Sequence, residues 1–210
     1  MSRGSPRIAV IDYGIGNLAS AQKAFIHLGV DAVLTNDARE IAGADGVVLP
    51  GVGNFGACMR ALRAADLETV ATECAMDERP FLGICVGMQM LFGGSDESPD
   101  IVGLGVVPGW VRSLPDTVKL PQIGWNTVET RVDSLMFQGL NAAPWLYFVH
   151  TFAAFDTDLD VVSGWCDYGT RFACAVERDT LWATQFHPEK SAAAGLHILR
   201  NFATHCGVSP

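Results

Sequence analysis

The sequence predicts an α/β fold: a central, mostly parallel sheet with helices on both faces, plus an antiparallel section in the second half. Two observations predict it. Short apolar runs alternate with helix-period segments in the first half, which is typical of a parallel sheet covered by helices. The second half holds short β-like segments separated by Gly, Pro, Asn and Asp, which favours antiparallel pairing. Without an internal repeat or linker, residues 1–210 are expected to form a single domain.

The first half is expected to supply four strands and the helices between them. The apolar runs that predict the strands cover residues 8–11, 32–34, 46–49 and 80–84. Apolar side chains from Leu18 to Leu28 recur at helical spacing, and Gly29 is expected to end that helix. The other expected helices cover residues 55–65, 66–77 and a short segment after the fourth strand that ends at Phe92.

The second half is expected to consist of short strands and one closing helix. The β-like segments cover residues 106–107, 122–128, 145–152, 161–168, 172–177 and 181–185. Leu199 and Phe202 face the core in the predicted helix from Ser191 to Cys206, and Ser191 is a candidate N-cap.

Composition excludes several classes of protein. A hydrophobic content of 49% excludes intrinsic disorder, and a net charge of −9 without a basic patch argues against binding to nucleic acid or anionic membranes. The longest mostly apolar run, residues 81–92, is shorter than the roughly 20 residues that a membrane-spanning helix needs. The N-terminus lacks a secretory signal, so a cytoplasmic protein is expected. The six cysteines form no metal-ligand pattern, so neither a metal nor a cofactor is predicted.

The segment Gly83-Ile84-Cys85-Val86-Gly87 is a candidate nucleophile turn. It has the G-x-S-x-G pattern with Cys in place of Ser, between a predicted strand and a predicted helix. Glycines are needed there because a Cβ on either flanking residue would collide with neighbouring backbone. The helix N-terminus favours a thiolate. The alternative is a structural cysteine buried at the end of a strand.

The segment Gln185-Phe-His-Pro-Glu-Lys-Ser191 is a candidate base segment. His187 and Glu189 lie two residues apart on an extended stretch, so their side chains point the same way. A carboxylate so placed can orient the imidazole and stabilise its protonated form, as in a catalytic triad. The alternative is a surface histidine beside a helix cap.

These two segments resemble the class I glutamine amidotransferase domains, and the resemblance extends from Ile8 to about Phe202. Further motifs are similar to one branch of that family, the glutaminase subunits of imidazole glycerol phosphate synthases, from histidine biosynthesis. The motifs are Asp12-Tyr-Gly-Ile-Gly-Asn17, Leu49-Pro-Gly-Val-Gly53, Gly83-Ile-Cys-Val-Gly-Met-Gln89, Gly124-Trp-Asn126, Tyr147-Phe-Val-His-Thr151 and the base segment itself.

The resemblance implies a glutaminase reaction and a three-layer domain. Cys85 would attack the side-chain amide of glutamine, His187 would carry the proton to the departing ammonia, and Glu189 would orient His187. A glutamyl thioester would form, and water would release glutamate.

The resemblance also implies the groups that stabilise the oxyanion. They are the backbone N–H of Val86 and those of the Gly51-Val52-Gly53 strand, assigned to Val52 and Gly53. That strand is expected to stay in an unproductive orientation until the partner is loaded.

Substrate contacts are implied for four residues. They are Gly51, Gln89, Thr151 and Phe152. Many relatives have Tyr at position 152 and His at position 122, where this chain has Phe152 and Gln122, so a hydroxyl contact and part of the interface differ here.

The implied partner is a separate (β/α)8-barrel cyclase subunit that forms a heterodimer with this chain and receives ammonia through an enclosed passage. The residues assigned to the interface by resemblance are Asn17, Trp125, Tyr147 and Lys190. His150 lies in an apolar β-run and is interpreted as a core histidine rather than a catalytic one.

Two other functions compete with this interpretation. A glutaminase could serve anthranilate, GMP or pyridoxal phosphate synthesis, although Met88 and the motifs Gly124-Trp-Asn126 and Tyr147-Phe-Val-His-Thr151 favour the histidine branch. A nucleotide-binding module is suggested by Gly14-x-Gly16-x-x-Ala19 and Gly51-x-Gly53-x-x-Gly56, which both fit the dinucleotide fingerprint. Two matches in one small domain show how weak that pattern is.

Overall fold

The computed structural model describes residues 6–208. Its main sheet begins with five parallel strands in the order β2, β1, β3, β4, β12. Their bounds are β1 (Arg7–Ile11), β2 (Asp31–Thr35), β3 (Gly46–Gly51), β4 (Phe81–Cys85) and β12 (Leu181–Thr184). The parallel half of the predicted fold is therefore confirmed.

The sheet continues with antiparallel strands, as predicted. The order after β12 is β11, β10, β7, and β5 joins the sheet through β9, which pairs with β11. These strands are β5 (Trp110–Ser113), β7 (Glu129–Thr130), β9 (Phe152–Phe155), β10 (Val162–Asp167) and β11 (Arg171–Arg178). A separate two-stranded ribbon pairs β6 (Gln122–Thr127) with β8 (Trp145–His150).

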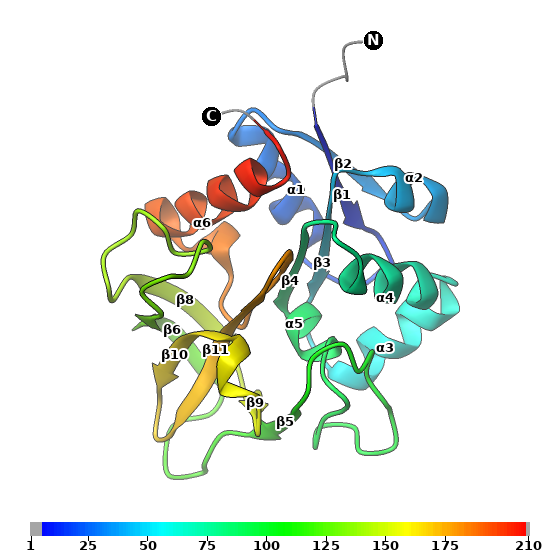
Figure 1. Ribbon diagram of the computed structural model, residues 1–210. Coiled ribbons are helices and arrows are strands. Elements are labelled where there is room, and N and C mark those ends of the chain that lie inside the picture. The colour runs from blue at the N-terminus through cyan, green and yellow to red at the C-terminus, as the bar shows by residue number, and fades with distance from the viewer. Residues whose placement is uncertain (1–5, 209–210) are drawn as a thin grey trace.

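Helices cover both faces of the parallel strands (Figure 1). One face carries α1 (Leu18–His27) and α6 (Ala192–His205), and the other carries α2 (Ala38–Gly43), α3 (Phe55–Ala64) and α4 (Glu68–Met76). Short helical turns are α5 (Val86–Met90), η1 (Leu159–Val161) and η2 (Pro188–Lys190). Within residues 6–208, no helix is long and apolar enough to cross a membrane.

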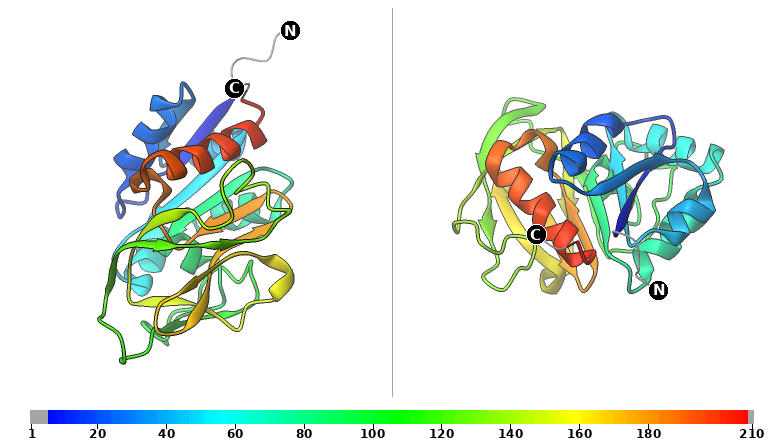
Figure 2. Two further views of the ribbon diagram at one scale, coloured as in Figure 1. Left: turned by 90° about the vertical axis from the view of Figure 1, so that its left-hand side faces the viewer. Right: turned by 90° about the horizontal axis from the view of Figure 1, so that it is seen from above.

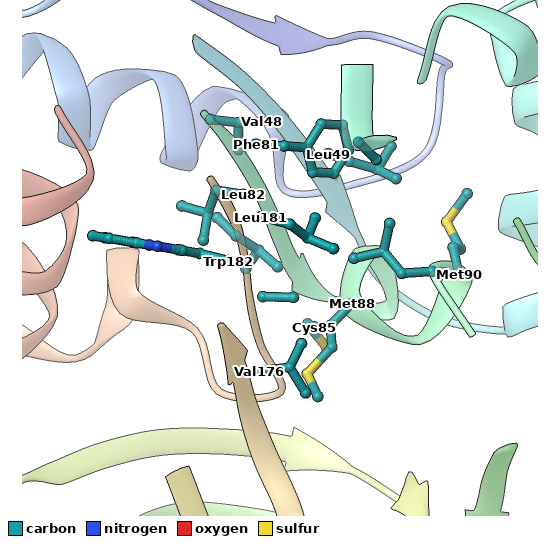
Figure 3. Packing of buried hydrophobic residues seen from close by; sticks show 14 of the residues in the cluster. Val48, Leu49, Phe81, Leu82, Cys85, Met88, Met90, Val176, Leu181 and Trp182 are labelled. Carbon is teal, nitrogen blue, oxygen red and sulfur yellow. The ribbon is translucent and has the colours of Figure 1, made fainter. Parts of the chain in front are cut away.

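The core lies between these layers. Phe202 of α6 packs against Phe25 of α1 and Trp182 of β12, with ring centroids 6.1 and 5.8 Å apart. Figure 3 shows side chains of β3, β4 and β12 packed together, with Cys85 and Met88 at one end of the cluster. The carboxyl end of β4 is therefore held by the packed core.

Three local predictions were wrong. Residues 106–107 form no strand, and the strand nearby is β5. The predicted strand over 145–152 bends at Thr151, which divides it into β8 and β9. The helix after β4 ends at Met90 rather than Phe92.

The second half of the chain forms one wall of the molecule. The side view in Figure 2 shows the antiparallel strands and the β6–β8 ribbon beside the parallel layer, with α6 passing across the end of both. The hydrogen bond from the His187 N–H to the Tyr147 carbonyl, 2.9 Å, ties the segment after β12 to β8. Because Thr184 of β12 pairs with Ile84 of β4, the base segment that follows β12 begins next to the end of β4.

Candidate active site

Cys85 lies at the junction of β4 and α5 in a strained backbone conformation. Its φ of +56° and ψ of −112° fall where side chains other than glycine rarely occur. The residue is 3% exposed and lines a cavity of about 510 Å³. The strain and the cavity together match the nucleophile turn predicted from the glycine pattern.

Gly87, which follows the nucleophile, and Gly51, at the end of β3, make this turn sterically feasible. A Cβ on Gly87 would lie 1.9 Å from the Leu49 carbonyl oxygen, and a Cβ on Gly51 would lie 2.6 Å from the Gly87 nitrogen. The start of α5 therefore rests directly on β3. Gly51 supports the turn in this way and is not among the residues that line the cavity.

His187 and Glu189 form a buried pair at the same cavity. The His187 Nδ1 lies 2.8 Å from the Glu189 Oε1, and both side chains are 2% exposed. Among the described residues, the His187 Nε2 has no hydrogen-bond partner. Because Cys85 and His187 both line the cavity, this nitrogen is left to exchange a proton with the sulfur.

The pKa of His187 is set by opposing effects. Burial lowers it, but the nearby Cys85 sulfur and the hydrogen-bonded Glu189 carboxylate outweigh burial and raise the pKa to about 9. At neutral pH the imidazole is therefore mostly protonated. A protonated imidazole beside a sulfur is suited to protonate a leaving group.

The three residues expected to supply oxyanion donors line the same cavity as Cys85. Val86 opens α5, so its N–H has no acceptor within the helix, and Val52 and Gly53 line the same cavity. The Cys58 Sγ donates to the Val52 carbonyl at 3.3 Å, and the Tyr13 hydroxyl donates to the Pro50 carbonyl at 2.7 Å. Two buried side chains that do not line the cavity therefore hold the segment from Pro50 to Val52.

The other expected substrate contacts also gather here. Gln89, Thr151 and Phe152 line the cavity together with His150. The Gln89 Nε2 donates to the Phe152 carbonyl at 2.9 Å. Burial lowers the pKa of His150 to about 4, and its Nδ1 lies 2.9 Å from the same carbonyl. His150 is thus buried and neutral at physiological pH, and it lies in the cavity wall.

Glu97 is a cavity residue that the sequence analysis missed. It follows α5 in a loop, and its carboxylate accepts a hydrogen bond from the Phe55 N–H at 2.6 Å. The loop also contains Asp96 and has no periodic pattern that singles out either acid. Only the tertiary structure shows that Glu97 supplies a negative charge to the cavity.

The four residues expected at a partner interface divide into two groups. Asn17 and Lys190 line the cavity, whereas Trp125 and Tyr147 lie on the β6–β8 ribbon. The two aromatic rings meet edge to face with centroids 6.0 Å apart, and Trp125 is 48% exposed. All six cysteines are free, and no cluster of metal-ligating side chains occurs among residues 6–208.

Comparison with known proteins places this geometry in context. Residues 9–206 match the family described as Glutamine amidotransferase class-I. The imidazole glycerol phosphate synthase subunit HisH of Methanothermobacter thermautotrophicus is 46% identical over 195 residues, which cover 93% of this chain and 96% of that protein. The protein of the same name from Dechloromonas aromatica is 45% identical over 213 residues, covering 96% and 98%.

Solved structures show the same fold at lower sequence identity. A crystal structure of a glutamine amidotransferase superposes with a TM-score of 0.75 at 20% identity and covers 96% of this chain and 99% of that one. A glutamine amidotransferase from Thermotoga maritima gives a TM-score of 0.68 at 16% identity, covering 99% and 100%. The three-layer arrangement predicted from the sequence is therefore confirmed.

Proposed function

The chain belongs to the class-I glutamine amidotransferase family, and from this premise we propose that it is the glutaminase subunit of an imidazole glycerol phosphate synthase. It hydrolyses glutamine to glutamate and ammonia, and the ammonia serves histidine biosynthesis. The observation that carries this proposal is the convergence of Cys85, His187 and Glu189 at one cavity in a chain 46% identical to such a subunit.

The first half of the reaction forms a thioester. The Cys85 sulfur attacks the side-chain carbonyl carbon of glutamine, and the carbon–nitrogen bond breaks. Because the pKa of His187 is about 9, its imidazolium gives a proton to the departing nitrogen, which leaves as ammonia. Glu189 stabilises the imidazolium through its 2.8 Å hydrogen bond.

The second half regenerates the enzyme. Water gives a proton to His187 while its oxygen attacks the thioester carbonyl, and the carbon–sulfur bond breaks. Glutamate leaves, and Cys85 is restored as a thiolate beside the imidazolium. Both steps place negative charge on the carbonyl oxygen, so the N–H groups of Val86, Val52 and Gly53 act as its donors.

The orientation of the Val52 strand regulates this reaction. Rotation of the Val52–Gly53 peptide, which carries the Gly53 N–H, breaks the hydrogen bond from the Cys58 thiol to the Val52 carbonyl, so this bond opposes a change in the orientation of that donor. Losing one oxyanion donor costs about 10²–10³ in rate. If the backbone N–H of this strand points away from the oxyanion, the glutaminase stays nearly inactive until the partner subunit has bound its ligand.

The cavity recognises the polar ends of glutamine. Glu97 provides a negative charge suited to the substrate ammonium group, and Thr151 and Phe152 also line the cavity. Both N–H groups of the Gln89 amide are used inside the protein, so its oxygen is left to accept from the substrate carboxamide.

A separate (β/α)8-barrel cyclase subunit docks over the cavity and forms a heterodimer with this chain. Support comes from the β6–β8 ribbon, where alternate residues face outward. Large apolar side chains on it are exposed: Ile123 (62%), Trp125 (48%) and Trp145 (59%). The ribbon continues into the cavity wall at Val149, so a partner bound there encloses the route by which ammonia leaves.

Replacement of Cys85 by Ala tests the proposal. We expect the variant complex to lose all glutamine hydrolysis but to keep synthesis from added ammonia, because only the nucleophile is removed. The assay measures glutamate and imidazole glycerol phosphate separately, with and without the cyclase and its ligand. Loss of both activities in a folded complex would contradict the division of labour, and failure to bind a cyclase would favour a glutaminase of another pathway.

A further inference from the structure

Gln185 contacts the nucleophile directly, yet the reaction as described gives it no role. It follows β12 and is fully buried, and its backbone N–H donates to the Cys174 carbonyl of β11 at 2.8 Å. Its side-chain Nε2 donates to the Cys85 sulfur at 3.8 Å. Its Oε1 accepts from the Gln89 Nε2 at 2.9 Å. One side chain therefore bridges the nucleophile and a residue of the substrate site.

The direction of these hydrogen bonds follows from the backbone. The Phe152 carbonyl oxygen can only accept, so the Gln89 atom 2.9 Å from it must be the amide nitrogen. The second N–H of that nitrogen points at Gln185, which must present its oxygen. The Gln185 nitrogen is then the only amide atom left for Cys85. A fixed backbone carbonyl thus sets the donor that faces the sulfur.

We propose that Gln185 is a positioning residue for glutamine hydrolysis: it donates a hydrogen bond to the Cys85 sulfur and holds Gln89 with its oxygen facing the substrate. A hydrogen bond donor beside sulfur favours the thiolate over the thiol. Because Gln185 is fully buried, water cannot replace its donor after substitution without opening the core.

The part of this proposal that concerns Gln89 rests on the proposed function. With Gln185 in place, both N–H groups of Gln89 are occupied, so only its oxygen can meet a ligand. Without the Gln185 acceptor, the Gln89 amide loses one of the two contacts that fix its orientation. The Gln89 amide then turns either its oxygen or its nitrogen toward the substrate, and this mixture of orientations weakens substrate binding.

The test uses two substitutions at this position and one matched control. Gln185→Met removes the donor and the acceptor at similar length. Gln185→Glu is isosteric and places a carboxyl group beside the sulfur, where two adjacent negative charges oppose thiolate formation. Gln138→Met makes the same chemical change at an exposed position. Thermal unfolding of each variant identifies those that fold like the wild type.

The first readout is the pH dependence of Cys85 alkylation by iodoacetamide, with the modified peptide identified by mass spectrometry. We expect Gln185→Met to slow alkylation at pH 7 by up to about tenfold, with recovery at higher pH, because loss of the donor beside sulfur leaves less thiolate. Gln185→Glu should be slower still, and Gln138→Met should match the wild type.

The second readout is glutamine hydrolysis by the loaded complex. Gln185→Met should lower kcat and raise KM, because both ends of the bridge are lost. A wild-type alkylation profile in a folded Gln185→Glu variant would overturn the contact with sulfur. If the wild-type chain fails to hydrolyse glutamine, the proposed function is wrong, but the alkylation profile still decides whether Gln185 acts on Cys85.

Discussion

The charge on His187 is set by two neighbouring side chains, those of Cys85 and Glu189. Burial alone would keep the imidazole neutral, as it does for His150, whose pKa falls to about 4. At His187 the Cys85 sulfur and the Glu189 carboxylate reverse that effect, and the pKa rises to about 9. Two histidines on one cavity therefore carry different charges, because only one of them has a buried acidic partner.

The raised pKa of His187 also predicts a pH-dependent stability. A group whose pKa is higher in the folded protein than its ordinary value of 6.5 stabilises the fold fully below about pH 6.5, and this contribution is lost as the pH rises through about 9. Glu189→Gln removes the carboxylate, so we expect it to lower the free energy of unfolding by about 2 kcal/mol at pH 6 and by much less at pH 9.5. Urea unfolding at the two pH values measures the difference. An equal loss at both would show that Glu189 does not stabilise the imidazolium.

Individual site residues were predictable to different degrees. Cys85, His187 and Glu189 lie in short motifs whose chemistry follows from residue type and spacing, so the sequence pointed to them. Glu97 and Gln185 act through contacts with distant segments, Phe55 in one case and Cys85 in the other. No local pattern marks Glu97. Gln185 begins the base segment, but nothing in that segment shows that its side chain contacts Cys85, because the partner is selected by packing.

At the scale of elements, the junction of β4 and α5 carries the chemistry. The turn needs close backbone contact with β3, and Gly51 and Gly87 allow it. Val47 to Gly51 pair with Phe81 to Cys85 in parallel register, so the ends of β3 and β4 lie side by side. The nucleophile and the oxyanion strand are thus neighbours because of sheet register.

Substitution of Gly87 tests this account. The Cβ of Gly87→Ala would lie 1.9 Å from the Leu49 carbonyl oxygen, which is backbone and cannot rotate away. We expect the variant to lose more than about 3 kcal/mol of stability or to fail to fold. Gly93→Ala is the matched control, because its nearest neighbour would lie 3.6 Å away, and it should cost less than about 1 kcal/mol. Similar stabilities of the two variants in thermal unfolding would contradict the steric argument.

The elements that the sequence analysis missed are those without a periodic pattern of their own. Helix α2 has six residues, of which only Ile41 is buried, and its start is set by Asp37, which caps the N–H groups of Arg39 and Glu40. Strand β5 has four residues and owes its identity to pairing with β9. Periodicity needs several buried positions, so such short elements cannot be detected by it.

At the scale of the whole molecule, the outward face of the β6–β8 ribbon is the surface that indicates a binding partner. Its inward residues Leu146 and Phe148 are fully buried, whereas Ile123 and Trp145 are mostly exposed. An exposed row of large apolar side chains beside a reactive cavity is typical of an interaction surface. It connects the fold to the proposed delivery of ammonia.

Truncation of Trp125 tests the docking surface. We expect Trp125→Ala to weaken binding to the cyclase roughly 10- to 100-fold, because tryptophans that become buried on binding contribute much of the affinity of an interface. The free energy of unfolding should change by less than about 1 kcal/mol. Calorimetry with the purified cyclase measures the dissociation constant. Met76→Ala, on α4 at 70% exposure, is the control and should bind normally. Unchanged affinity of Trp125→Ala would place the interface elsewhere.

The sequence by itself determined the α/β class, the strained turn at Cys85 and the pairing of His187 with Glu189, because steric limits, periodicity and spacing act over a few neighbouring residues. Only the tertiary structure decided that the sulfur and the imidazole border one cavity, that Glu97 joins them, and that Gln185 turns a donor toward Cys85. Those relations depend on strand order, register and packing between segments far apart in the chain, where the free energy of each contact depends on all the others.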